Sequence, residues 1–155
     1  PYLPDEQGNL KYIPDWYGGT IANLERAIKA CPETNFIGHA PGFWREISGD
    51  AEMDCKLYPQ VPVVEGGKLY RLFKKYSNLY GCISANSGLT ALNRDPEHAK
   101  KFVTAFADRI LFGRDFFGSD WQDFLNSLKL SQNIMDRVYF KNALKLVKPG
   151  FPIQK

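Results

Sequence analysis

The sequence has few histidines and cysteines, the residues that supply most zinc ligands and all disulfides. Its 155 residues include only two histidines, His39 and His98, and three cysteines. The cysteines, Cys31, Cys55 and Cys82, lie far apart and form no CxxC pair. An odd number of scattered cysteines favours reduced thiols, so an intracellular, cytoplasmic setting is expected.

Long apolar runs and concentrated charge are also missing. No run approaches the ~18 apolar residues of a membrane span, so no membrane partner is expected. The net charge is +3, and the basic residues are scattered in short groups such as LFKKYSN. That scatter indicates solvated helix faces rather than a nucleic-acid surface. Hydrophobic residues nevertheless make up 44% of the chain, which predicts that residues 1–155 form a single globular unit with a real core.

Helical and strand patterns alternate along the chain, and this alternation predicts an α/β fold with a parallel sheet. Residues 1–19 and 40–66 are rich in turn-forming residues and are predicted to be loops. Three strands alone leave apolar edges open. Either the first stretch hides strands, or the chain belongs to a larger sheet or barrel. The helices are predicted at about 20–31, 69–76, 96–107 and 120–147, and the strands at 35–39, 79–84 and 109–115.

Each predicted strand ends at or near a polar residue: His39, Ser84 or Asp115. Active sites of parallel α/β sheets lie beyond the carboxyl ends of the strands. Side chains alternate along a strand, so Gly113 shares a face with Asp115 and leaves room beneath it. An imidazole and a carboxylate converging there suit a divalent metal such as zinc, with the carboxylate taking a proton from metal-bound water. The alternative is that both side chains cap loops.

Four segments, taken in order, resemble the last three βα units of the amidohydrolase superfamily, and its amidohydrolase 2 branch in particular. They are NFIGHAPGFW, GCISANSG, ILFGRDFF and YFKNALKLV. The resemblance spans roughly residues 19–147. It implies a (β/α)8 TIM barrel that holds one or two divalent metals. Most members of the family are hydrolases, and some are decarboxylases or hydratases.

The resemblance implies roles for individual residues. His39 would contact the metal, its bound water or the substrate, and Asp115 would be a metal ligand and proton acceptor. Ser84 and Asn86 follow the seventh barrel strand, where they either contact substrate or cap the loop. Arg114 stands where the family often has serine. It either pairs with an anionic substrate or turns outward.

The loop after His39, APGFWREISGD, adds two candidates for substrate binding, Trp44 and Arg45. Loops at this face of a barrel set substrate choice. An aromatic ring beside an arginine suits a flat or anionic substrate. The alternative is that Phe43 and Trp44 pack the loop onto the barrel rim.

The chain departs from the family in its missing histidines, since it has neither the first-strand HxH nor the fifth-strand histidine. His98 is expected on a helix surface. Two ligands do not complete a zinc site, and a whole barrel usually takes about 250 residues. We therefore expect the C-terminal part of a longer enzyme. By itself it would hold no metal or a weakly bound one, and it would associate with the missing half or with further copies.

The expected function is metal-dependent hydrolysis of a small-molecule amide, ester or lactone, with zinc as the metal. A metal-dependent decarboxylase of an aromatic or related acid is the alternative among enzymes. A third possibility, of a different class, is a non-catalytic barrel remnant that acts as a binding module.

Overall fold

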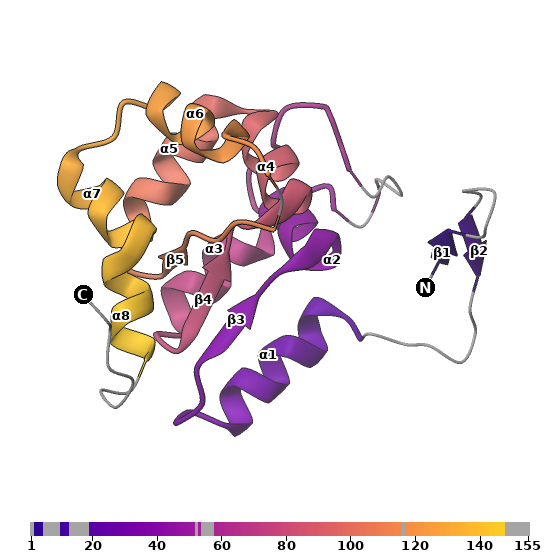
Figure 1. Cartoon of the computed structure of the whole chain (residues 1–155). Helices are drawn as coiled ribbons and strands as arrows, with labels where there is room; N and C mark the ends of the chain where they lie inside the picture. Colours follow the sequence, from indigo (N-terminus) through magenta and orange to yellow (C-terminus); the bar gives the residue numbers. More distant parts are fainter. Residues whose placement is uncertain are drawn as a thin grey trace.

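A three-stranded parallel sheet lies at the centre of the computed structural model (Figure 1). Its strands are β3 (Phe36–Gly38), β4 (Leu79–Cys82) and β5 (Ile110–Leu111), in that order across the sheet. The α/β prediction is therefore confirmed, although each strand is shorter than its predicted range. The described residues are 2–4, 10–12, 19–51, 53, 58–115 and 117–147.

The predicted helices are present, and the C-terminal one is divided into several pieces. Thr20 caps α1 by accepting a hydrogen bond from the backbone N–H of Asn23, as expected of an N-cap threonine. Asp95 caps α5 in the same way. The helical elements are α1 (Ile21–Ala30), α2 (Ala40–Trp44), η1 (Arg45–Ile47), α3 (Lys68–Lys75), α4 (Ala85–Asn93), α5 (Pro96–Ala105), α6 (Asp120–Ser127), α7 (Gln132–Asp136), η2 (Arg137–Lys141) and α8 (Asn142–Leu146).

Two loop predictions are wrong in part. Within residues 1–19, β1 (Tyr2–Pro4) and β2 (Leu10–Tyr12) pair as an antiparallel sheet of their own. Within 40–66, α2 and η1 are helical. Pro41 lies in the first turn of α2 and does not break it, because the N–H groups of the first turn have no partner within the helix. Helix α4 is an element that the sequence patterns missed.

The core contains a cluster of aromatic rings that pack against one face of the sheet. Trp44, Phe73 and Phe102 are fully buried, and the rings of Phe73 and Phe102 lie 5.4 Å apart, centre to centre, in an edge-to-face arrangement. Such pairs add to the stabilisation that comes from burial alone. Two glycines on the strands leave space for aromatic rings to pack against the sheet. A Cβ atom at Gly38 would lie 2.2 Å from the ring of Phe43, and one at Gly81 would crowd Trp44.

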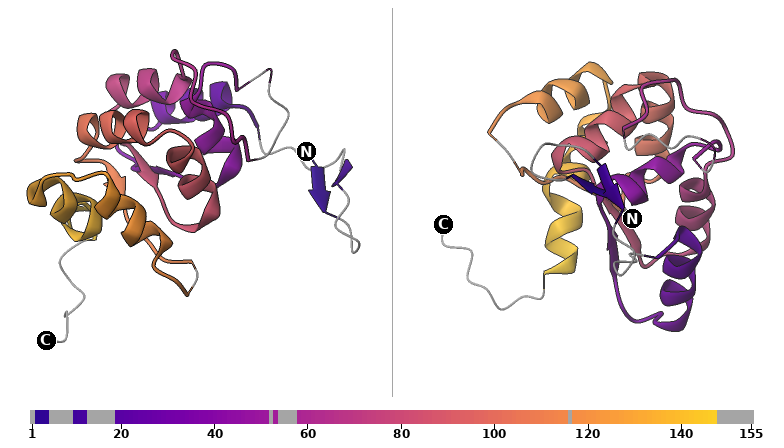
Figure 2. Two further views of the ribbon diagram at one scale, coloured as in Figure 1. Left: turned by 90° about the horizontal axis from the view of Figure 1, so that it is seen from above. Right: turned by 90° about the vertical axis from the view of Figure 1, so that its right-hand side faces the viewer.

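The helices at the two ends of the chain lie on opposite sides of the molecule (Figure 2). The indigo α1 is tied to α3 by Glu25, whose carboxylate pairs with Arg71 at 2.8 Å and Lys75 at 2.9 Å. The yellow α8 packs beside β5, where buried Asn142 donates 2.8 Å hydrogen bonds to the carbonyls of Ala107 and Ile110. Among the described residues, no helix is long and apolar enough to span a membrane.

Candidate functional site

The carboxyl ends of the three parallel strands share one edge of the sheet, and the candidate residues follow these ends. His39 comes directly after β3, Ser84 lies two residues after β4, and Asp115 lies four residues after β5. Parallel pairing of β3 and β4 brings the first two side chains together. The Oγ of Ser84 lies 3.5 Å from the Nδ1 of His39.

Cys82 extends this contact along β4. Its Sγ lies 3.1 Å from the Oγ of Ser84, because residues two apart on a strand point to the same face. Ser84 is only 5% exposed, whereas the His39 side chain is exposed at the strand end. A buried hydroxyl therefore connects a partly buried thiol to an exposed imidazole.

Gly113, expected to leave room beneath Asp115, packs against Ser84 instead. A Cβ atom at this position would lie 3.1 Å from the Cβ of Ser84 and 3.8 Å from the Sγ of Cys82. The absence of a side chain at Gly113 thus allows the β5 end to approach the β4 end closely. The glycine does make room, but for the serine of the neighbouring strand.

Asp115, Arg114 and Asn86 line one surface pocket together with the start of α6. Both Asp115 and Arg114 are exposed. The Arg114 guanidinium donates a 2.9 Å hydrogen bond to the carbonyl of Gly118, which holds it over its own loop. Phe117 lies in the same pocket lining and is 92% exposed. This pocket therefore offers a carboxylate, a guanidinium, an amide and an aromatic ring to a small molecule.

Trp44 does not reach this pocket, and its expected role in substrate binding is corrected here. The side chain is completely buried, and its Nε1 donates a 2.9 Å hydrogen bond to the carbonyl of Cys82. The ring of Phe43 packs edge-on against it at 5.3 Å. Of the two interpretations of Phe43 and Trp44, packing is therefore the correct one, since two large aromatic rings are more stable against the sheet than in water.

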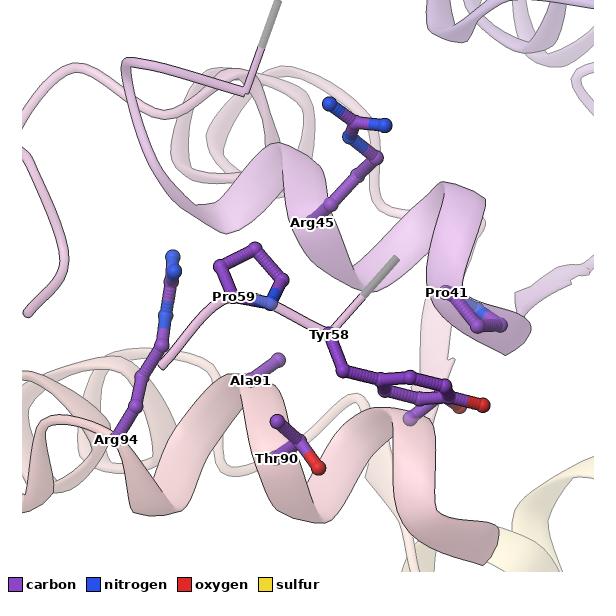
Figure 3. A pocket seen from close by; sticks show the side chains of 8 residues that line it. Pro41, Arg45, Tyr58, Pro59, Thr90, Ala91 and Arg94 are labelled. Carbon is purple, nitrogen blue, oxygen red and sulfur yellow. The ribbon is translucent and has the colours of Figure 1, made fainter. Parts of the chain in front are cut away.

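Arg45 lies in a different pocket, between α2 and α4 (Figure 3). Tyr58 and Pro59 lie between the two helices, and the Arg45 guanidinium points away from α4. It donates a hydrogen bond to the carbonyl of Ala51. Arg45 therefore joins none of the other candidate residues in the pocket beside Asp115.

His98 is half-buried rather than on the surface, so this prediction is also corrected. Its ring packs edge-on against Tyr70, with ring centres 5.3 Å apart. Burial lowers the pKa of His98, and the nearby Asp95 carboxylate partly opposes this effect. The His98 ring, packed against Tyr70, belongs to the packing between α3 and α5.

A complete metal site is not formed by the described part of the chain. No group of three or more histidine, cysteine, aspartate or glutamate side chains comes together there. The side chains of His39 and Asp115 have suitable chemistry for zinc, but two ligands alone do not complete a tetrahedral site. Cys55 lies outside the described residues.

Cys82 and Phe117 are the neighbours of the candidate residues that sequence reasoning missed. The signal for Cys82 was present, because CIS places it two residues before Ser84 on the same strand face. The exposure of Phe117 had no signal in the sequence, since a phenylalanine in a loop is equally compatible with burial.

Comparisons with protein-family models, curated proteins and solved structures found no match to this chain. The amidohydrolase resemblance thus depends on the sequence motifs alone.

Proposed function

We propose that the chain is the C-terminal part of a (β/α)8 barrel in a metal-dependent hydrolase of the amidohydrolase 2 type. The observation that carries the proposal is the shared edge of the sheet. Three consecutive parallel strands lead to His39, Ser84 and Asp115 in the order of the family motifs. A shared edge is where active sites of parallel α/β folds form.

In this proposal His39 and Asp115 hold one divalent metal together with ligands from outside this chain. Zinc suits an imidazole and a carboxylate. When bound, such a metal polarises a carbonyl and activates water. The residues of this chain would bind the metal, orient the substrate and move protons. Asp115, whose side chain is exposed, would accept the proton at its Oδ atoms.

The substrate would lie in the pocket that Asp115 lines. Asn86 and Arg114 flank it and can donate hydrogen bonds to a carbonyl or carboxylate oxygen. An amide, ester or lactone carbonyl would then lie beside the carboxylate that moves the proton.

Two alternatives have support from specific features. The exposed ring of Phe117 beside Arg114 suits an aromatic carboxylic acid, which favours a metal-dependent decarboxylase. The lack of a third metal ligand among the described residues fits a non-catalytic remnant that acts as a binding module.

The decisive assay uses the protein expressed from its complete gene and supplied with zinc. Lactones, esters and amides are compared with aromatic carboxylic acids, before and after removal of metal by a chelator. Hydrolysis that is lost with the metal and in Asp115→Asn supports the lead proposal. Asp108→Asn is the matched control, because Asp108 is an exposed carboxylate just before β5, at the opposite end of that strand. Release of carbon dioxide from the acids would favour the decarboxylase, and no turnover at all would favour the binding module.

A further inference from the structure

We propose that Ser84 is a positioning residue that holds the His39 imidazole in its Nδ1–H tautomer and so leaves Nε2 unprotonated. This inference deepens the proposed function and rests on it, because an unprotonated Nε2 is what a metal or a proton donor would bind. Its direct observable is nevertheless the tautomer, which is measurable without metal or substrate.

Burial limits the partners that the Ser84 hydroxyl can bond. Its side chain is 5% exposed, so its hydroxyl must find partners inside the protein. Two lie within reach: the Nδ1 of His39 at 3.5 Å and the Sγ of Cys82 at 3.1 Å. A hydroxyl both accepts and donates. Each of the two contacts can run in either direction. The proposed order is the one in which His39 Nδ1–H donates to Ser84 Oγ and Ser84 O–H donates to Cys82 Sγ, because only this order leaves the Nε2 of His39 unprotonated.

The backbone around His39 leaves its ring available for this contact. His39 occupies the N-cap position of α2 with extended backbone angles, φ −152° and ψ 171°, and its side chain does not cap the helix. Its Nδ1 therefore points to the neighbouring strand end instead of the helix N–H groups. Histidine ligands of metals commonly donate their second ring N–H to such a partner, which fixes the tautomer and the ring orientation.

Close packing keeps Ser84 in place. A Cβ atom at Gly113 would lie only 3.1 Å from the Cβ of Ser84, so the β5 end closely borders the serine. This placement reassigns Ser84 from possible substrate contact to support of His39, because a hydroxyl shared between two neighbours in the protein has little left to offer a ligand.

The tautomer can be read directly by NMR of the 155-residue chain with ¹⁵N-labelled histidine. The chain has two histidines, so the ring spectrum is simple, and His98 serves as an internal reference. Long-range ¹H–¹⁵N correlations distinguish a protonated Nδ1 from a protonated Nε2, at a pH where the resonances report the neutral ring. We expect the Nδ1–H form for His39 in the unmodified chain.

Substitution of Ser84 separates positioning from general structure. Ser84→Ala should shift His39 toward the Nε2–H form, and Ser84→Thr, which keeps the hydroxyl, should restore the Nδ1–H form. Ser87→Ala is the matched control: Ser87 is also 5% exposed but lines the pocket between α2 and α4, so His39 should not respond. His98 should be unchanged in all of these variants.

Two results would overturn the inference: a predominant Nε2–H form in the unmodified chain, or a tautomer that Ser84→Ala leaves unchanged. Should Ser84→Ala fail to fold, Ser84→Cys provides a weaker acceptor, and an unchanged tautomer there would equally contradict the inference. Addition of Zn²⁺ to the protein from the complete gene tests the proposed function separately. A tautomer that depends on Ser84, in a protein that does not bind zinc, would support the positioning role and contradict the proposed metal site.

Discussion

The indole nitrogen of Trp44 donates a 2.9 Å hydrogen bond to the carbonyl oxygen of Cys82, and the Trp44 side chain is completely buried. The bond ties the last residue of α2 to the last residue of β4. It therefore fixes the segment that follows His39 against the strand that leads to Ser84. This relationship makes Trp44 a structural support of the candidate site.

Replacement of Trp44 should mainly lower stability. Trp44→Ala removes a fully buried ring and is expected to cost about 3–5 kcal/mol in the free energy of unfolding. Trp44→Phe keeps most of the burial and should cost less, chiefly through the lost hydrogen bond. Urea denaturation measures both. Phe117→Ala, at a 92% exposed position, is the control and should change stability by less than about 0.5 kcal/mol. A Trp44→Ala variant as stable as that control would contradict the packing role.

Asn142 should stabilise the sheet at its β5 edge. Its Nδ2 donates to the carbonyls of Ala107 and Ile110, both at 2.8 Å, and the side chain is fully buried. Asn142→Ala leaves both carbonyls without this donor, so we expect a loss of about 2 kcal/mol or more. Thermal unfolding monitored by circular dichroism provides the measurement. Asn133→Ala, at an exposed position on α7, should have almost no effect, and equal losses in the two variants would refute this assignment.

The Glu25 cluster should make stability depend on pH in the acid range. Hydrogen bonds from Arg71 and Lys75 lower the pKa of Glu25 from 4.5 to about 2 in the folded chain. A carboxyl group with a depressed folded-state pKa stabilises the fold fully above its unfolded pKa. That contribution is lost as the pH falls from about 4.5 toward 2.

Comparison with Glu25→Gln isolates this contribution. At neutral pH the variant should be less stable by about 1 kcal/mol, since the partners Arg71 and Lys75 are about half exposed. The difference should shrink as the pH approaches 2 and as salt is added. Denaturation curves at several pH values measure it, and a difference that stays constant down to pH 2 would show that the ion pairs do not stabilise the fold.

The sequence predicted the parallel sheet well because buried strands and amphipathic helices have distinct periods. The spacing of Leu69, Leu72 and Phe73 predicted α3, and all three side chains are buried there. Helix α4 was not predicted because its segment, ANSGLTALN, combines serine, glycine and asparagine, which are poor helix formers in isolation. Its buried face, including Ala91 and Leu92, stabilises it through tertiary packing that local propensity does not contain.

The candidate site was predictable where it depends on strand ends and unpredictable where it depends on side-chain direction. The positions of His39 and Ser84 after parallel strands follow from the order of the elements. Whether Trp44 points to the core or to a substrate depends on space, and that space exists because Gly81 lies beneath its ring. Sequence periodicity alone does not reveal such a fit between distant residues.

A metal site at His39 and Asp115 is tested by the metal content of the protein expressed from its complete gene, measured by mass spectrometry after gel filtration. We expect about one divalent metal or more per chain in the unmodified protein, and at least about tenfold less in both His39→Ala and Asp115→Asn. His98→Ala, which alters the other histidine, should keep the full metal content. An unmodified protein without metal, or metal retained equally in all three variants, would show that His39 and Asp115 are not metal ligands.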